Sequence, residues 1–316
     1  MQSRNICTWV LIGLVLGSPA SLLAQQITSF KLVQLSGTVE VKETGADKFT
    51  AAQTGRVYAF GTAVRTGRNA NVVLELSPGN TVRLQARTTL TVVPNVKAPN
   101  LVAVSLGEGK VDVKLDKFPR DAKFQVETPV GICAAVGTKF SVTFREGENG
   151  ALKEMTVECT EGHVVYTSTA GPGGQGSLSG GGKLRVEVYE TAGAFYVKLT
   201  VTGQPLDIGV GDSTMHLDAD TTVEMVALKV PDKFDDQGRP VTEDRTAVKC
   251  TAGKATVGQT EIKPGQDAVF VENNQVNQSL AAQTEFDNYR PPRGRRGPPA
   301  FVPPVIHDVP QSPGGI

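Results

Sequence analysis

Small and β-branched residues alternate with polar ones along most of the chain, and at four places a glycine comes just before the alternation. The four phrases are Leu35–Val41, Leu106–Val113, Cys159–Val165 and Cys250–Val257. Each phrase predicts a tight turn that opens into a half-buried strand. Because a recurring unit of this kind buries its apolar face against its neighbours, the pattern indicates an architecture built by repetition.

The same alternation predicts many short strands in the first half of the chain. We expect strands at 30–42, 57–66, 71–77, 80–85, 89–94, 101–105, 110–115, 123–128, 133–144, 153–159 and 163–168. Ser77-Pro-Gly-Asn80 predicts a hairpin, because Pro and Gly suit the two central turn positions. Glu146–Gly150 predicts a second hairpin. No window has a persuasive helical period, and Ser279–Asn288 comes nearest.

We therefore predict an all-β fold of stacked hairpins, packed either as a sandwich or as a short β-solenoid. The glycine-dense stretch 171–182 predicts a connecting loop. We expect a first domain over 27–190 and a smaller second β module over 194–272. The phrase at Cys250 parallels the phrase at Cys159, which is consistent with a second module that is a diverged partial copy. Residues 285–316 are rich in Pro and Arg and predict a disordered tail.

Residues 1–24 have the layout of a secretory signal peptide. Arg4 precedes an apolar run from Ile6 to Gly17, and small residues follow it. We expect cleavage after Ala24, with cleavage after Ala20 as the alternative, and an uncleaved anchor stays open. The apolar run is shorter than the ~20 residues that span a bilayer, and no later stretch approaches that length. We therefore expect an exported chain whose mature form has no transmembrane helix.

Charge is balanced over the whole chain, with 32 basic and 32 acidic residues. This balance removes the usual electrostatic argument for a nucleic-acid partner. The C-terminal tail is locally basic. Its arginines could contact an anionic surface weakly, although a solvated tail is the simpler interpretation. They are Arg290, Arg293, Arg295 and Arg296.

One series of phrases between residues 36 and 168 resembles a known family. Phe124-Gln-Val-Glu-Thr-Pro-Val-Gly131 followed by Val136-Gly-Thr-Lys-Phe-Ser-Val142 is its most specific part, and Glu161-Gly-His-Val164 closes it. The series is similar to the FecR-type periplasmic domain of Gram-negative signal transducers. The resemblance implies an exported all-β domain in the periplasm or outside the cell. In those transducers a cytoplasmic segment that binds a sigma factor precedes the domain; we expect a signal peptide in its place here, so that role is not carried over.

The signature residues of this family make structural sense on their own. Thr128-Pro129 favours an extended backbone that ends a ladder, while Gly131 and Gly137 permit a bend or a close approach within an apolar strand. We expect a structural role for the whole signature. It consists of Thr128, Pro129, Gly131, Gly137, Thr138, Phe140 and Gly162.

Cysteine usage leaves two interpretations open. After removal of Cys7 with the signal peptide, an odd number of cysteines remains in a compartment that permits disulfides. A bridge between Cys133 and Cys159 is one expectation, and buried thiols are the commoner outcome. Cys250 takes the same strand face in its repeat as Cys159 does, so both look like core residues.

Sequence motifs that would indicate catalysis, phosphate binding or metal binding match only poorly. The glycine-rich stretch that ends in Gly182-Lys183 lacks the Ser or Thr and the first Gly of a phosphate-binding loop, and Gly176–Gly180 centres on Leu178, where a nucleophile elbow needs Ser. A zinc site at Cys159 and His163 is disfavoured by the expected hairpin turn between them. A loose acidic set matches no calcium loop, so solvated strand ends are favoured. The set consists of Asp207, Asp212, Asp218 and Asp220.

These observations favour a protein that is not an enzyme and that needs no cofactor or metal. We expect an exported FecR-domain protein that binds or scaffolds in the cell envelope, through contacts of strand edges and loops such as 171–182 with a protein or a glycan. The alternative is a periplasmic sensory or regulatory component that acts with a separate membrane transducer.

Overall fold

The computed structural model describes residues 27–93, 100–116, 123–147, 150–191, 194–211, 213–234, 237, 240–271 and 276–277. Every regular element within these ranges is a strand, which confirms the all-β prediction. Among these residues no helix is long and apolar enough to cross a membrane. The expected signal peptide, the expected tail with its four arginines and the stretch 279–288 lie outside the described residues.

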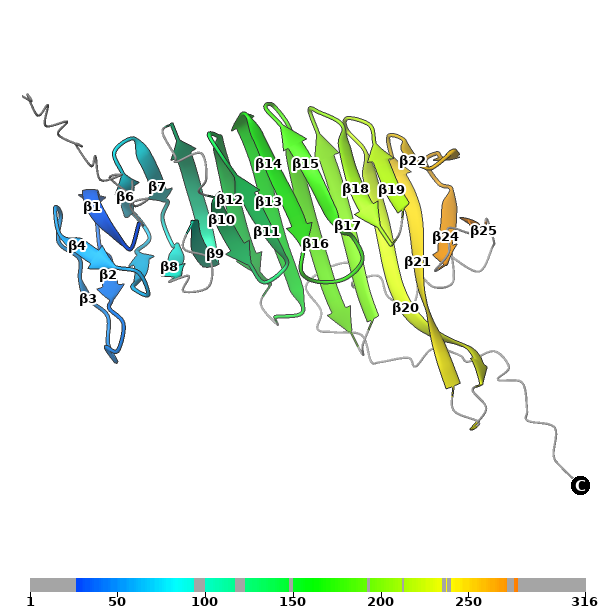
Figure 1. Ribbon diagram of the computed structural model, residues 1–316, viewed down its shortest axis with the longest axis horizontal. Coiled ribbons are helices and arrows are strands. Elements are labelled where there is room, and N and C mark those ends of the chain that lie inside the picture. The colour runs from blue at the N-terminus through cyan, green and yellow to red at the C-terminus, as the bar shows by residue number, and fades with distance from the viewer. Residues whose placement is uncertain are drawn as a thin grey trace, which may run out of the picture.

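Two sheets run the length of the molecule (Figure 1), and we call them sheet A and sheet B. In spatial order, sheet A contains β4 (Val57–Ala59), β1 (Ser29–Ser36), β6 (Asn71–Ser77), β7 (Asn80–Leu84), the second part of β9 (Leu101–Leu115), β12 (Lys139–Glu146), β13 (Leu152–Glu161), β16 (Lys183–Thr191), β17 (Ala194–Thr202), β20 (Thr222–Phe234), β21 (Pro240–Ala252), β24 (Asp267–Val271) and β25 (Val276–Asn277).

Sheet B has the same layout. It contains β3 (Thr50–Ala51), β2 (Val39–Lys42), β5 (Ala63–Thr66), β8 (Thr89–Val93), the first part of β9, β10 (Lys123–Thr128), β11 (Gly131–Ala135), β14 (His163–Ser168), β15 (Gln175–Ser179), β18 (Leu206–Val210), β19 (Ser213–Leu217), β22 (Ala255–Val257) and β23 (Thr260–Ile262). The β9–β10 pair is parallel, and the other pairs are antiparallel.

From β12 onward the chain forms hairpins that alternate between the two sheets. β12–β13, β16–β17, β20–β21 and β24–β25 are in sheet A, while β14–β15, β18–β19 and β22–β23 are in sheet B. The last strand of each hairpin pairs with the first strand of the next hairpin in the same sheet, as in β13–β16, β15–β18 and β17–β20. Stacked hairpins therefore build a sandwich that grows along one axis (Figure 1).

A single apolar core lies between the sheets, because alternate side chains of every strand point inward. It extends from Phe30 in β1 to Ala268 in β24. Phe124 of sheet B and Phe140 of sheet A meet across it in an edge-to-face contact, with ring centroids 6.5 Å apart. Each large side chain buried in this way contributes roughly 1.5–3 kcal/mol to folding.

The structure corrects several strand boundaries that the sequence predicts. The expected strand 30–42 is divided into β1 and β2, and 133–144 is divided into β11 and β12, with the two parts in different sheets. Glycines with positive φ, Gly37 at 74° and Gly137 at 63°, lie where the chain passes from one sheet to the other. Conversely, 101–105 and 110–115 belong to the one long strand β9, which takes part in both sheets.

The structure shows continuous sheets near residues 190–194, where the sequence suggests a boundary between two domains. That position falls in the hairpin between β16 and β17, whose strands pair from Lys183 to Thr202. Both sheets and the core continue past it. The second module is therefore an extension of the first stack, because its edge strands find partners there instead of forming edges of their own.

The glycine-dense stretch 171–182 is not simply a loop. Residues 175–179 form β15, paired with β14 on one side and β18 on the other. Gly176 is buried, and a Cβ there would lie 2.8 Å from the carbonyl oxygen of Asp207. Gly174 and Gly209 also lie close together: a Cβ on Gly174 would lie 3.4 Å from the Gly209 Cα, and the Gly174 amide donates a hydrogen bond of 2.7 Å to the Gly209 carbonyl. The glycines thus permit close packing of backbone against backbone.

Candidate functional site

The Thr128-Pro129-Val130-Gly131 turn closes the β10–β11 hairpin. Thr128 Oγ1 accepts a hydrogen bond from the Gly131 amide (3.1 Å) and donates one to the Gly131 carbonyl (2.8 Å). The Tyr166 hydroxyl donates to the Val130 carbonyl at 3.3 Å, so a buried side chain of β14 also holds the turn. A Cβ on Gly131 would overlap the Tyr166 ring. The close approach expected at Gly131 is confirmed, and the turn is a structural feature of the core.

The sequence predicts that Gly137 lies inside a strand over 133–144, and the structure corrects this prediction. Gly137 forms the corner where the chain leaves β11 in sheet B for β12 in sheet A, and a Cβ there would meet nothing within 4 Å. The glycine is required for its φ of 63°, not for a close approach. Phe140, three residues later, is buried in the core.

Gly162 lies at the corner where the chain leaves β13 in sheet A for β14 in sheet B, so the expected hairpin turn at 161–162 is wrong. Gly162 has φ 84° and packs against Thr138. The same contact recurs in two of the other three repeated phrases, where Gly109 faces Thr88 and Gly253 faces Thr221.

Thr138 belongs to the signature expected from the sequence, whereas Thr88 and Thr221, which take the same place at the other two corners, could not be singled out there. Thr221 Oγ1 accepts from the Lys254 amide and donates to the Lys254 carbonyl, both at 3.0 Å. Thr88 bonds the backbone of Lys110 in the same way, at 3.0 and 3.2 Å. The threonines lie 22 to 33 residues before their partners, so only the repetition of the contact could have revealed them.

The cysteines are buried thiols, and the structure does not form the Cys133–Cys159 bridge. Cys133 lies in sheet B between Val126 and Tyr166, whereas Cys159 ends the inward row of β13 in sheet A. Cys133 and Phe140 are both buried although their positions have opposite parity, because Gly137 moves the chain from one sheet to the other between them. Burial raises the pKa of the Cys133, Cys159 and Cys250 thiols, and Cys133 is the most strongly affected.

Cys159 and His163 are not brought together as metal ligands. Cys159 points into the core, whereas His163 is exposed and lies 3.3 Å from the hydroxyl of Ser179. Among the described residues no group of His, Cys, Asp or Glu could hold a metal ion.

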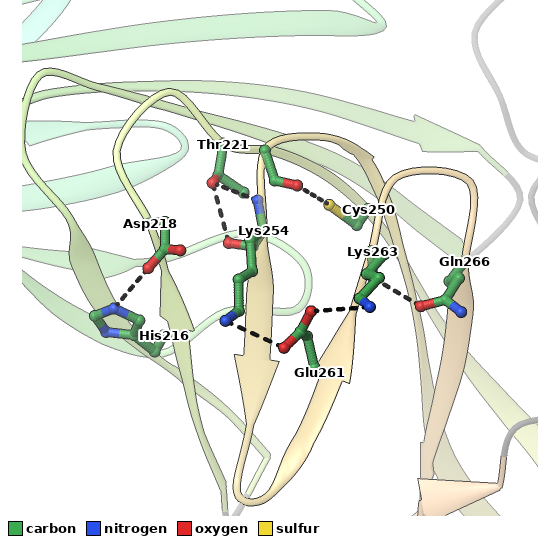
Figure 2. A network of polar contacts seen from close by, with 9 residues as sticks. His216, Asp218, Thr221, Cys250, Lys254, Glu261, Lys263 and Gln266 are labelled. Atoms are coloured by element: carbon green, nitrogen blue, oxygen red, sulfur yellow. Dashed lines mark hydrogen bonds and ion pairs between the residues drawn. The ribbon is translucent and has the colours of Figure 1, made fainter.

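Two residues of the loose acidic set, Asp207 and Asp218, contact the exposed His216 of sheet B, and Figure 2 shows the contact with Asp218. His216 Nδ1 lies 2.6 Å from Asp207 and Nε2 lies 3.1 Å from Asp218. The Asp207 hydrogen bond raises the pKa of His216, and the charges of Asp207 and Asp218 add to the effect while desolvation opposes it. Asp220 lies at a turn with φ 60°, and Asp212 lies outside the described residues.

Ion pairs continue beside this histidine (Figure 2). Lys254 lies 3.1 Å and Lys263 3.6 Å from the Glu261 carboxylate, which accordingly has a lowered pKa. These groups are all largely exposed, and exposed pairs contribute little to stability.

The middle of the outer face of sheet B carries few charged residues. One row across β10, β11, β14 and β15 consists of Gln125, Ala134, Val165 and Ser177. The next row consists of Ser105, Glu127, Ile132, Thr167 and Gln175. All of these side chains are half-buried or exposed. We call these two rows the B face, and they are the candidate interaction surface.

The sequence favours binding through strand edges, but the edges of these sheets are poorly suited to it. The terminal strands β3, β4, β23 and β25 are two or three residues long. Very short edge strands are a common device against pairing with another chain. The B face therefore offers a broader surface than any edge among the described strands.

Comparison with known proteins identifies the class of the central domain. Residues 62–165 match the family described as FecR protein, from the start of β5 into β14. This match confirms the resemblance to a FecR-type domain over these residues. It includes the Thr128–Gly131 turn, the Gly137 corner and most of the B face.

Two solved structures show similarity at 18% identity. They are crystal structures at 2.50 Å and 1.65 Å resolution of a predicted anti-sigma factor from Parabacteroides distasonis ATCC 8503, with TM-scores of 0.32 and 0.33. Each alignment covers 43% of this chain and 58% of that one, so the chain spans less than two thirds of the neighbour. No curated protein matches the chain.

Proposed function

We propose that this chain is a non-catalytic FecR-type binding protein of the cell envelope, which contacts a protein or glycan partner through the B face. The single observation that supports the proposal is the pair of rows on the outer face of sheet B, most of which lie within the FecR-matched region. Side chains that paired strands already hold in place cost little ordering entropy on association. The strands place Ala134 and Val165 side by side at the centre of the B face.

Substitution of the B face tests this proposal. Ala134→Arg and Val165→Arg each place a long charged side chain on the face without touching the core, so the thermal midpoint should stay close to that of the parent. Recovery of the partner from native envelope fractions should fall at least tenfold, because an unpaired charge is buried on binding. Thr200→Arg, on the outer face of sheet A, is the matched control. Unchanged recovery of the partner with both variants would show that the partner does not bind through the B face.

A second candidate is a periplasmic sensory or regulatory component that acts with a separate membrane transducer. The FecR match favours it, since a domain of this type is named for regulatory proteins. The same recovery experiment distinguishes the candidates. A transducer among the recovered proteins favours regulation, while recovered glycan favours wall binding.

The proposal includes export and cleavage of residues 1–24. Arg4 and the apolar run that ends at Gly17 support it. N-terminal sequencing of the native protein should find Gln25, or Ser21 if cleavage follows Ala20. An intact Met1 in the membrane fraction would instead indicate an anchor, with the B face still available.

A further inference from the structure

The strand β11 is apolar on both of its faces, unlike the strands beside it. Cys133 and Ala135 point into the core and are buried. Ile132 and Ala134 lie on the outer face and are half-buried, and Val136, directly after the strand, is 51% exposed. An antiparallel sheet with one face in solvent normally carries polar residues on that face, whereas an unbroken apolar run is typical of a strand covered on both faces. The outer side of β11 therefore has the composition of a covered surface, although it is exposed.

Polar residues border this apolar surface on both sides. Strand register places Val165 of β14 beside Ala134, and we call Ile132, Ala134, Val136 and Val165 the B strip. The outward residues of β10 on one side are Lys123, Gln125 and Glu127, and those of β15 on the other side are Gln175, Ser177 and Ser179. The B strip is therefore two strands wide, which is about 10 Å, and Ile132 and Val136 lie about 13 Å apart along it.

We propose that the B strip binds one amphipathic α-helix of a partner protein, which lies along β11. The proposal rests on the proposed function and names the element of the partner that the B face receives. A helix is about 10–12 Å across, so it covers two strands and leaves the polar borders in solvent. The length of the strip corresponds to about nine helical residues, which is enough for apolar side chains at i, i+3 or i+4, and i+7.

The charged residues on the border disfavour a broader occupant. Neighbouring strands are about 4.8 Å apart, so a facing β-sheet of several strands would cover β10 as well as β11 and β14. It would remove Lys123 and Glu127 from water, which is unfavourable unless each charge finds a partner. A single helix avoids this desolvation because it ends where the charged border begins.

The same two charges set the direction of the helix. Glu127 stands at one end of the strip, paired with Ile132. Lys123 stands at the opposite end, one position beyond Phe124 and its partner Ala135. A helix carries partial positive charge at its N-terminus and partial negative charge at its C-terminus. The N-terminus of the bound helix therefore lies near Glu127 and its C-terminus near Lys123.

Photocrosslinking from the B strip of the full chain, expressed in its native host, tests the proposal. p-Benzoylphenylalanine is placed at position 132, 134 or 136 in three separate variants, and at position 200, on the outer face of sheet A, as the control. Mass spectrometry then identifies the residues joined to each position. We expect the three positions to reach one partner segment, at residues roughly four apart, with position 132 nearest its N-terminus. Position 200 should not reach that segment.

Other crosslinking patterns would overturn the proposal. Residues two apart would indicate a strand, several separate segments would indicate a facing sheet, and peptides of this chain would indicate a second copy. Recovery that depends on Ala134 and Val165 without any protein crosslink would indicate a glycan. Each of these results leaves the B face as the binding surface and removes only the helix. Unchanged recovery with the arginine variants of the B face would remove the proposed function as well.

Reversal of the charge at one end tests the direction of the helix. Lys123→Glu should lower recovery of the partner roughly threefold or more, because it places a negative charge beside the negative end of the helix. Lys31→Glu, exposed on the outer face of sheet A, changes the net charge equally and should leave recovery unchanged. Equal recovery of the partner with the two variants would overturn the assigned direction.

Discussion

Cys159 in β13 and Cys250 in β21 occupy the same place in two hairpins of sheet A, with the β16–β17 hairpin between them. The Cys159 thiol points at the carbonyls of Glu161 (3.7 Å) and Gly162 (3.5 Å), and the Cys250 thiol points at those of Ala252 (3.4 Å) and Gly253 (3.7 Å). The Gly181 amide bonds the Cys159 carbonyl at 2.8 Å and the Gly265 amide bonds the Cys250 carbonyl at 2.9 Å. The parallel between the two phrases in the sequence is thus a parallel of local structure.

Thiol labelling should report the burial of all three core cysteines. Burial raises the pKa of each thiol, and the thiolate is the reactive form. We expect Cys133, Cys159 and Cys250 to label only as fast as the protein unfolds, and to label completely in denaturant without a reductant. Labelling of Cys250 alone in denaturant would show that Cys133 and Cys159 are bridged.

Replacing the corner threonines with valine should change the free energy of unfolding differently in two repeats. Thr221→Val leaves the Lys254 amide and carbonyl without a buried partner and should cost about 1–3 kcal/mol in the free energy of unfolding. Thr138 Oγ1 is buried with no hydrogen-bond partner within the described residues, so Thr138→Val should be nearly neutral or stabilising. Urea unfolding measures both, and equal losses would show that Thr138 is also bonded in solution.

Gly131→Ala should destabilise the fold through overlap with the Tyr166 ring and the end of Met155. Overpacking of this kind typically costs about 1–3 kcal/mol. The double variant with Tyr166→Phe keeps the ring and should not rescue stability, whereas Tyr166→Leu should recover part of the loss. Thermal melting of the set checks this, and a Gly131→Ala midpoint equal to the parent would refute the close packing.

Substitution of Gly137 should lower stability through backbone strain alone. Gly137→Val should cost about 1–2 kcal/mol, because its φ of 63° is left-handed. Gly137→Asn should recover most of that loss, since Asn tolerates this conformation and a side chain there meets open space. If Gly137→Asn were as unstable as Gly137→Val in the same melting experiment, a clash would have to be the cause.

His216 should make a small pH-dependent contribution to stability. Its pKa is raised in the folded state by Asp207 first, so the contribution is complete below the unfolded pKa of about 6.5 and is lost as pH rises through the folded pKa. The pair is exposed and screened, so the effect is small. His216→Gln should abolish it in urea titrations at pH values on either side. Asp207→Asn should lower the His216 pKa measured by NMR more than Asp218→Asn does.

Strand identity could be predicted from the sequence, because alternation and turn residues act locally. β6, β10 and β14 begin and end at the predicted residues, and the Ser77–Asn80 turn forms the expected hairpin with Gly79 at φ 85°. The passage between sheets could not be predicted in this way. Gly37, Gly137 and Gly162 look like turn or bulge glycines locally, and only pairing with distant strands makes them corners.

The candidate surface was less accessible to sequence reasoning than the core. Ala134 and Val165 are unremarkable in their own strands, and they become a surface because β11 and β14 place them side by side.

Because hairpins alternate between the two sheets, the number of hairpins sets the length of the molecule. Each strand from β13 onward pairs with its neighbours by one rule, seen in β17–β20, β19–β22 and β21–β24. A pair of hairpins could be inserted or deleted while the rest of the stack keeps the same contacts, because each unit touches only the units next to it. Such a change would lengthen or shorten the distance between the first strands and the last ones. The body can therefore serve as a molecular ruler, in which the copy number of a unit sets how far apart the two ends are held.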